Sequence, residues 1–207
     1  MALKVNTIWL SVDYRLAPEY TFQTQIEDCR SVLEWVAKNK TQFSSDSAKI
    51  GVSGDSAGGH YSAILSHEYK NLIDYQVLIY PCVDLANTYE SNREFSRECF
   101  WLTKDMIDFF IKNFIPNPSL EDLGDPKISP LLNKDFTGLP KSLIIAAELD
   151  PLVDQIKVYH EKLTSNSNQS ELKIIKGTIH GFFHNGFFLK EAMNETLQHI
   201  SEFFKQI

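Results

Sequence analysis

Apolar residues along the chain follow two different periods. Short apolar runs rich in β-branched residues predict strands at 7–13, 49–53, 75–80, 142–147 and 172–175. Apolar residues at helical spacing predict helices at 25–40, 56–69 and 153–163 and a last helix holding Met193 to Ile207. Strands that alternate with helices are typical of a parallel sheet covered by helices on both faces. The sequence therefore predicts an α/β fold, and a length of 207 residues fits a single domain.

This alternation stops at about residues 84–138, where polar loops surround one amphipathic helix. The apolar stripe of that helix contains Met106, Ile107, Phe110 and Phe114, and Thr103 stands where a capping side chain is expected. We predict that this stretch is an insertion that forms a lid.

Composition and charge narrow the classes of function. The net charge of −7 provides no basic surface for phosphates, so we expect a small-molecule substrate rather than nucleic acid. Three widely spaced cysteines without a Cys-x-x-Cys pair predict buried thiols rather than a disulfide framework or a metal site. We expect no metal and no cofactor.

The first apolar run predicts neither a signal peptide nor a membrane span, because it is short and Asp13 and Arg15 follow it at once. The expected chain is soluble, with the cytoplasm as its default compartment. A homodimer is a further prediction.

Gly54-Asp55-Ser56-Ala57-Gly58 fits the pattern Gly-x-Ser-x-Gly between a predicted strand and a predicted helix. In that context the serine sits on a strained turn with its hydroxyl exposed, and the flanking glycines let backbone segments approach each other closely. Ser56 is the predicted nucleophile, and the backbone N–H of Ala57 is a predicted oxyanion donor.

A serine hydroxyl needs a histidine to accept its proton and a carboxylate to orient that histidine. Asp150 and His180 each follow a predicted strand, in the chain order that this motif requires. Asp154, as a helix cap, and Glu148 are weaker candidates for the acid. The other five histidines are predicted to be structural: His60, His67, His160, His184 and His199.

The chain resembles the hormone-sensitive-lipase branch of the α/β-hydrolases, which includes carboxylesterases and arylacetamide deacetylases. Five stretches carry the resemblance in family order, at residues 13–19, 54–59, 129–132, 150–154 and 179–182. The resemblance implies an α/β-hydrolase fold, a triad of Ser56, Asp150 and His180, and hydrolysis of esters with short to medium acyl chains.

One family feature is absent from this sequence, namely the His-Gly-Gly-Gly loop that supplies oxyanion donors ahead of Asp13. The resemblance therefore implies an N-terminally incomplete catalytic domain in which a central strand and part of the oxyanion hole are not encoded. Two alternatives to an active esterase stay open: a weak or inactive fragment, and a ligand-binding receptor on the same fold. A peptidase or thioesterase could use the same triad.

Aromatic residues near the lid and near His180 are candidates for an acyl pocket. We expect Phe182, Phe183 and Trp101 to contact the substrate. The wider set also contains Phe95, Phe100, Phe109, Phe114, Phe187 and Phe188.

Overall fold

The fold is built on a four-stranded parallel sheet. A computed structural model describes residues 2–44 and 47–207. The strands are β1 (Gly51–Asp55), β2 (Tyr75–Ile79), β3 (Lys141–Leu149) and β4 (Ser170–Ile179), paired in the order β1-β2-β3-β4. The central strands β2 and β3 consist largely of fully buried apolar residues, as expected for a sheet covered on both faces. The expected α/β fold is confirmed.

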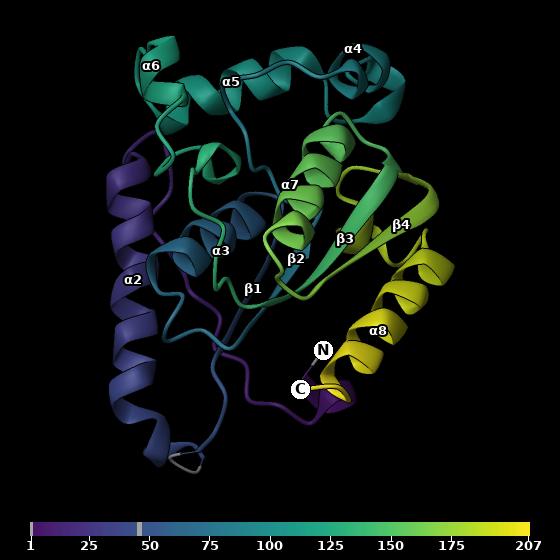
Figure 1. The fold of residues 1–207 in the computed structure, drawn as a ribbon. Coiled ribbons are helices and arrows are strands. Elements are labelled where there is room, and N and C mark those ends of the chain that lie inside the picture. Colours follow the sequence, from purple (N-terminus) through teal and green to yellow (C-terminus); the bar gives the residue numbers. More distant parts are fainter. Residues whose placement is uncertain (1, 45–46) are drawn as a thin grey trace.

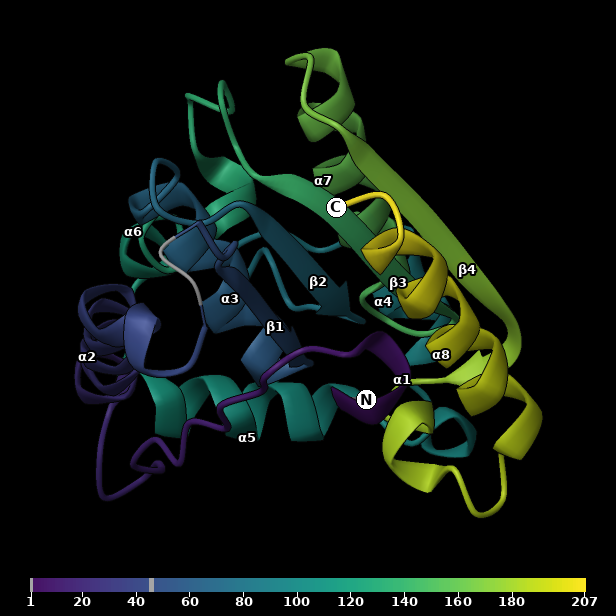
Figure 2. The same ribbon diagram turned by 90° about the horizontal axis from the view of Figure 1, so that it is seen from below.

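Helices cover both faces of this sheet. Figures 1 and 2 show α3 (Ala57–Glu68) and α7 (Val153–Ser165) on one face and α8 (Lys190–Phe204) on the other. The helix α2 (Phe22–Asn39) packs beside α3, and a short helix α1 (Ala2–Val5) contacts α8. The predicted helices at 25–40, 56–69 and 153–163 therefore match observed ones within a few residues.

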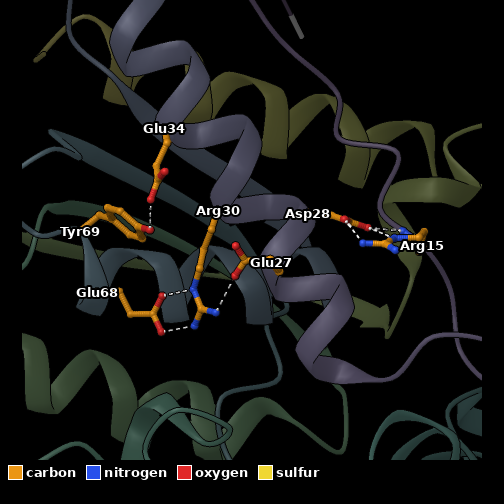
Figure 3. Close-up of polar contacts among 7 residues, drawn as sticks. All are labelled: Arg15, Glu27, Asp28, Arg30, Glu34, Glu68 and Tyr69. Carbon is orange, nitrogen blue, oxygen red and sulfur yellow. Dashed lines mark hydrogen bonds and ion pairs between the residues drawn. The ribbon is translucent and has the colours of Figure 1, made fainter.

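Ion pairs fix the position of α2 at two points (Figure 3). Arg30 on α2 binds Glu68 at the end of α3, with Nη2 2.5 Å from Oε1. Asp28 on α2 binds Arg15 of the preceding segment, with Oδ1 2.7 Å from Nη2. The helix is thereby linked both to α3 and to the N-terminal segment.

The segment predicted as a strand at 7–13 is not one. Residues 7–16 have no regular secondary structure, and they run past β1 without joining the sheet (Figure 2). A β-strand needs a neighbouring ladder for its peptide groups, and no described strand pairs with this segment. The composition of the segment favours a strand, but its pairing partner is lacking among the described residues.

The region at 84–138 contains α4 (Glu90–Phe95), α5 (Lys104–Phe114) and α6 (Leu120–Leu123). These helices extend across the edge of the sheet where the strands end (Figure 1). Thr103 caps α5 as predicted, because its side chain accepts a hydrogen bond from the backbone N–H of Met106 at 3.2 Å. Phe110 of the predicted apolar stripe is 53% exposed. That this region acts as a lid stays a prediction.

Candidate active site

Ser56 lies on a sharp turn between β1 and α3. Its backbone has φ +50° and ψ −114°, a conformation that residues with a side chain rarely adopt. Gly54 makes the turn possible, because a Cβ at this position would lie 2.2 Å from the carbonyl carbon of Gly58. The strained serine and the close backbone contact agree with the expected turn. The backbone N–H of Ala57 opens α3 beside the serine.

The loops after β3 and β4 bring Asp150 and His180 to this turn. The Oγ of Ser56 lies 2.8 Å from Nε2 of His180, and Nδ1 of His180 lies 2.8 Å from Oδ2 of Asp150. The other carboxylate oxygen of Asp150 accepts a hydrogen bond from the backbone N–H of Leu152 at 2.9 Å. Asp150 is fully buried and His180 is 6% exposed. The three residues singled out from the sequence thus form one continuous hydrogen-bonded chain.

The two weaker candidates for the acid bind other groups. Glu148 accepts hydrogen bonds from Nζ of Lys176 and from the backbone N–H of Gly177, and these hold the pKa of Glu148 below its ordinary value. Asp154 accepts a hydrogen bond from the backbone N–H of Ser91. Asp154 does not cap α7, because the capping position is Leu152, so its expected role as a cap is wrong.

Most of the remaining histidines have structural contacts away from Ser56. His60 is buried, its Nδ1 lies 2.9 Å from the carbonyl oxygen of Cys82, and burial lowers the pKa of His60 to about 4. Burial likewise lowers the pKa of His67 to about 4. His160 contacts Ser170 through Nδ1, and His199 lies near Glu195 on α8.

His184 departs from this pattern because it contacts the turn that holds Ser56. Its Nε2 lies 2.5 Å from Oδ2 of Asp55, the residue before Ser56. The pair links the loop that carries His180 to the end of β1. Sequence reasoning missed it, since no spacing rule relates residues 55 and 184.

Tyr80 is a second neighbour of the site that the sequence did not indicate. Its ring centroid lies 4.8 Å from that of His180, and its backbone has φ +35°. Burial raises the pKa of Tyr80, and the nearby carboxylate of Asp55 raises it further. The Tyr80 ring therefore packs against the imidazole of His180.

A groove of about 770 Å³ extends along β1 to Ser56 and Ala57. Of the three expected pocket residues, Phe183 lines this groove. Phe182 is fully buried and packs on Tyr80 in the main core, so its expected contact with substrate is not supported. Trp101 is 60% exposed near Gly181.

The described residues contain no cluster of histidine, cysteine or acidic side chains able to hold a metal ion. The three thiols are free; Cys29 is buried and Cys82 half-buried, but Cys99 is exposed, so the prediction of buried thiols is wrong for Cys99.

Within residues 2–44 and 47–207, no helix has both the length and the apolar content needed to cross a membrane.

Comparison with known proteins identifies the family. Residues 1–184 match the model of a family described by its alpha/beta hydrolase fold. The chain belongs to this α/β-hydrolase family. An arylesterase of Saccharolobus solfataricus is 33% identical over 176 residues, which are 84% of this chain and 57% of the arylesterase. A carboxylesterase of Mycobacterium tuberculosis is 32% identical over 203 residues, or 94% of this chain and 62% of the relative.

Solved structures of esterases resemble the chain over nearly its whole length. An esterase of Pyrobaculum calidifontis is 34% identical and superposes with a TM-score of 0.91. The match covers 99% of this chain and 67% of the esterase chain. A thermostable carboxylesterase cloned from a metagenomic library is 35% identical and superposes with a TM-score of 0.87. The match covers 97% of this chain and 70% of the carboxylesterase chain. The chain thus spans 57% to 70% of the length of these four similar proteins.

Proposed function

We propose that this chain is the catalytic part of a serine carboxylesterase, with Ser56 as nucleophile, His180 as base and Asp150 as orienting acid. The observation that carries the proposal is the hydrogen-bonded chain from Ser56 through His180 to Asp150 at the end of a groove. The names of the arylesterase and carboxylesterase relatives support the same reaction.

The first half of the reaction follows from the directions of these hydrogen bonds. An ionised carboxylate only accepts, so Asp150 fixes the proton of His180 on Nδ1 and leaves Nε2 free to accept. Nε2 takes the proton from Ser56 as Oγ attacks the ester carbonyl carbon. The negative charge that develops on the carbonyl oxygen is stabilised by the N–H of Ala57 and the positive end of α3.

The second half releases both products. The tetrahedral intermediate breaks its bond to the alcohol oxygen, which takes the proton from Nε2 of His180 and leaves an acyl group on Ser56. Water then attacks the acyl carbon as Nε2 of His180 removes its proton. Collapse of the second intermediate breaks the bond to Oγ of Ser56, which takes that proton from Nε2, and frees the carboxylic acid. Atoms balance without any cofactor: one ester and one water give one acid and one alcohol.

The proposed substrates are esters with short to medium acyl chains. Relatives named ethyl acetate hydrolase, from Pseudomonas putida, and acetyl esterase, from Salmonella choleraesuis, favour the short end of this range. A chromogenic acetate and decanoate pair measures the preference directly.

We further propose that the 207-residue chain by itself turns over slowly. Ala57 is the one oxyanion donor assigned among the described residues, and removal of a single donor from such a site costs about 10² to 10³ in rate. Nucleophile labelling is therefore a better first test than turnover.

The test is covalent labelling by a fluorophosphonate, with the modified peptide identified by mass spectrometry. We expect Ser56 to be labelled and Ser56→Ala to remain unlabelled. Ser11→Ala is the matched control, because Ser11 lines the same groove and is exposed. Labelling that persists in Ser56→Ala would reject the assignment, and an unlabelled folded wild type would favour a receptor or an inactive fragment.

A further inference from the structure

The turn that follows His180 contacts the Ser56 turn at two points. Nε2 of His180 lies 2.8 Å from Oγ of Ser56, and Nε2 of His184 lies 2.5 Å from Oδ2 of Asp55. Asp55 and Ser56 are neighbours in the chain, so both contacts end on the same turn. A single hydrogen bond would leave the His180 turn free to rotate about that bond. Two hydrogen bonds to neighbouring residues fix its orientation as well.

Hydrogen bonds within the turn connect His184 to the backbone next to His180. Gly181 has φ +78°, a conformation that favours glycine, and a short 3-10 helix follows at Phe182–Asn185. The carbonyl oxygen of Gly181 accepts from the backbone N–H of His184 at 3.1 Å and from Nδ2 of Asn185 at 3.2 Å. A displacement of His184 is therefore passed on to the residue that adjoins His180.

Apolar packing holds the first part of this turn more firmly than the part beyond His184. Phe182 is fully buried and packs on Tyr80. Phe187 and Phe188 are 91% and 83% exposed and contact each other. His184 lies between these two parts, and its bond to Asp55 attaches the turn sideways to the end of β1.

Asp55 also lies close to Tyr80, which is a second support of His180. Burial raises the pKa of Tyr80, and the carboxylate of Asp55 raises it further, so the two groups are near each other. The ring of Tyr80 packs against the imidazole of His180, with centroids 4.8 Å apart. Asp55 is thus a neighbour both of the ring that contacts His180 and of the turn that carries it.

We propose that His184 is a positioning residue, whose bond to Asp55 holds the turn 180–185 at the place where Nε2 of His180 meets Oγ of Ser56. This role rests on the proposed function, in which His180 is the base. An ionised carboxylate only accepts, so the proton of the pair stands on Nε2 of His184. The side chain of His184 is 68% exposed, and an exposed pair contributes little to stability. Its loss should therefore change the reactivity of Ser56 and not the stability of the fold.

The experiment compares variants by the second-order rate of fluorophosphonate labelling at Ser56, with urea unfolding to measure stability. His184→Ala removes the donor and should be labelled at least about tenfold more slowly at unchanged stability. His184→Gln places an NH2 group at a similar distance from the backbone and should recover most of the wild-type rate. His160→Ala is the matched control, because it removes a histidine that contacts Ser170 on β4, away from Ser56, and it should keep the wild-type rate.

Substitution of Asp55 tests the partner in the same assay. Asp55→Ala should slow labelling, and the double variant with His184→Ala should be no slower than the slower single variant, because both substitutions break one bond. Asp55→Asn should keep most of the rate, since its amide oxygen still accepts from Nε2 of His184. Effects that multiply in the double variant would show that the two residues act independently and would overturn the proposal.

The ring nitrogens of His180 give a readout that needs no ester and no reactive probe. In protein with isotope-labelled histidine, the nuclear magnetic resonance signal of Nε2 of His180 reports the hydrogen bond to Ser56, and Ser56→Ala supplies the signal without that bond. His184→Ala should move the signal toward this reference, and His184→Gln should not.

The two readouts separate the positioning role from the esterase chemistry. An unlabelled wild type in which His184→Ala still moves the signal of His180 would reject the chemistry and keep the positioning role. An unmoved signal in His184→Ala, or a His184→Gln variant no better than His184→Ala, would overturn the positioning role whether or not Ser56 is labelled.

Discussion

Replacement of Asp150 by asparagine tests how the carboxylate controls His180. The carboxylate accepts from two groups, Nδ1 of His180 at 2.8 Å and the N–H of Leu152 at 2.9 Å. An asparagine has one carbonyl oxygen and one NH2 group, so it can accept from only one of these two donors. If it accepts from Leu152, its NH2 faces Nδ1, the imidazole proton moves to Nε2, and Ser56 loses its base.

The size of the effect follows from two contributions. The asparagine keeps the proton of His180 on Nδ1 only if its oxygen faces Nδ1 and its NH2 group faces the N–H of Leu152. Two donors then face each other in a buried place, and an unsatisfied buried group costs about 1–3 kcal/mol. Loss of the negative charge about 4 Å from the imidazolium centre removes roughly 4 kcal/mol at an effective dielectric constant of about 20. Together these predict a decrease of about 10⁴ in rate, at about 1.4 kcal/mol per factor of ten.

The assay is the second-order rate of fluorophosphonate labelling at Ser56, with circular dichroism to show that the variant is folded. Asp154→Asn is the control, since Asp154 is also a carboxylate near the start of α7 but binds Ser91 and Lys157. Its labelling rate should stay within tenfold of wild type. A decrease of less than tenfold in folded Asp150→Asn, or a larger decrease in Asp154→Asn, would refute this account of the acid.

Two further predictions concern stability. Gly54→Ala should lower the free energy of unfolding by at least about 1–3 kcal/mol, because the new Cβ would lie 2.2 Å from the backbone of Gly58. Gly58→Ala is the control and should keep the wild-type stability, because its Cβ would meet nothing within 4 Å. Equal losses of stability for the two variants in urea unfolding would contradict the prediction. His60 has a pKa of about 4 in the folded chain against an ordinary 6.5, so the unfolded state takes up its proton first and stability falls as the pH drops from about 6.5 to 4. The loss of stability is on the order of 3 kcal/mol. In His60→Phe the free energy of unfolding should change less between pH 6.5 and pH 4 than it does in the wild type. An equal change in both proteins would show that His60 is not the cause.

The sequence patterns correctly predicted elements whose formation depends mainly on the residues within one segment. An apolar run predicted β2, and small residues together with Ala63, Ile64 and Leu65 predicted α3; both elements occur where expected. The cap at Thr103 depends on its own helix turn and is likewise confirmed. The segment at 7–13 failed because strand formation needs a partner, and no property of the segment itself reports whether one is present.

The candidate site shows the same division. Ser56, Asp150 and His180 follow strands of one parallel sheet, and the carboxyl ends of such strands meet at one edge, so their convergence could be foreseen. The contact between His184 and Asp55 and the tilted ring contact of Tyr80 with His180 could not be foreseen, because both arise from loop geometry. Phe182 was misplaced for a related reason: an aromatic residue beside a candidate base packs equally well toward the core.

The wide separation of the three site residues along the chain has a consequence for biosynthesis. Ser56 and His180 are 124 residues apart, and β4, which leads to His180, is the last of the described strands in chain order. At a synthesis rate of about 5–20 residues per second from the N-terminus, Ser56 is therefore made roughly 6 to 25 s before His180. Under the proposed triad, Ser56 becomes reactive only when β4 has joined β3. A reactive Ser56 would therefore report that the four described strands have assembled.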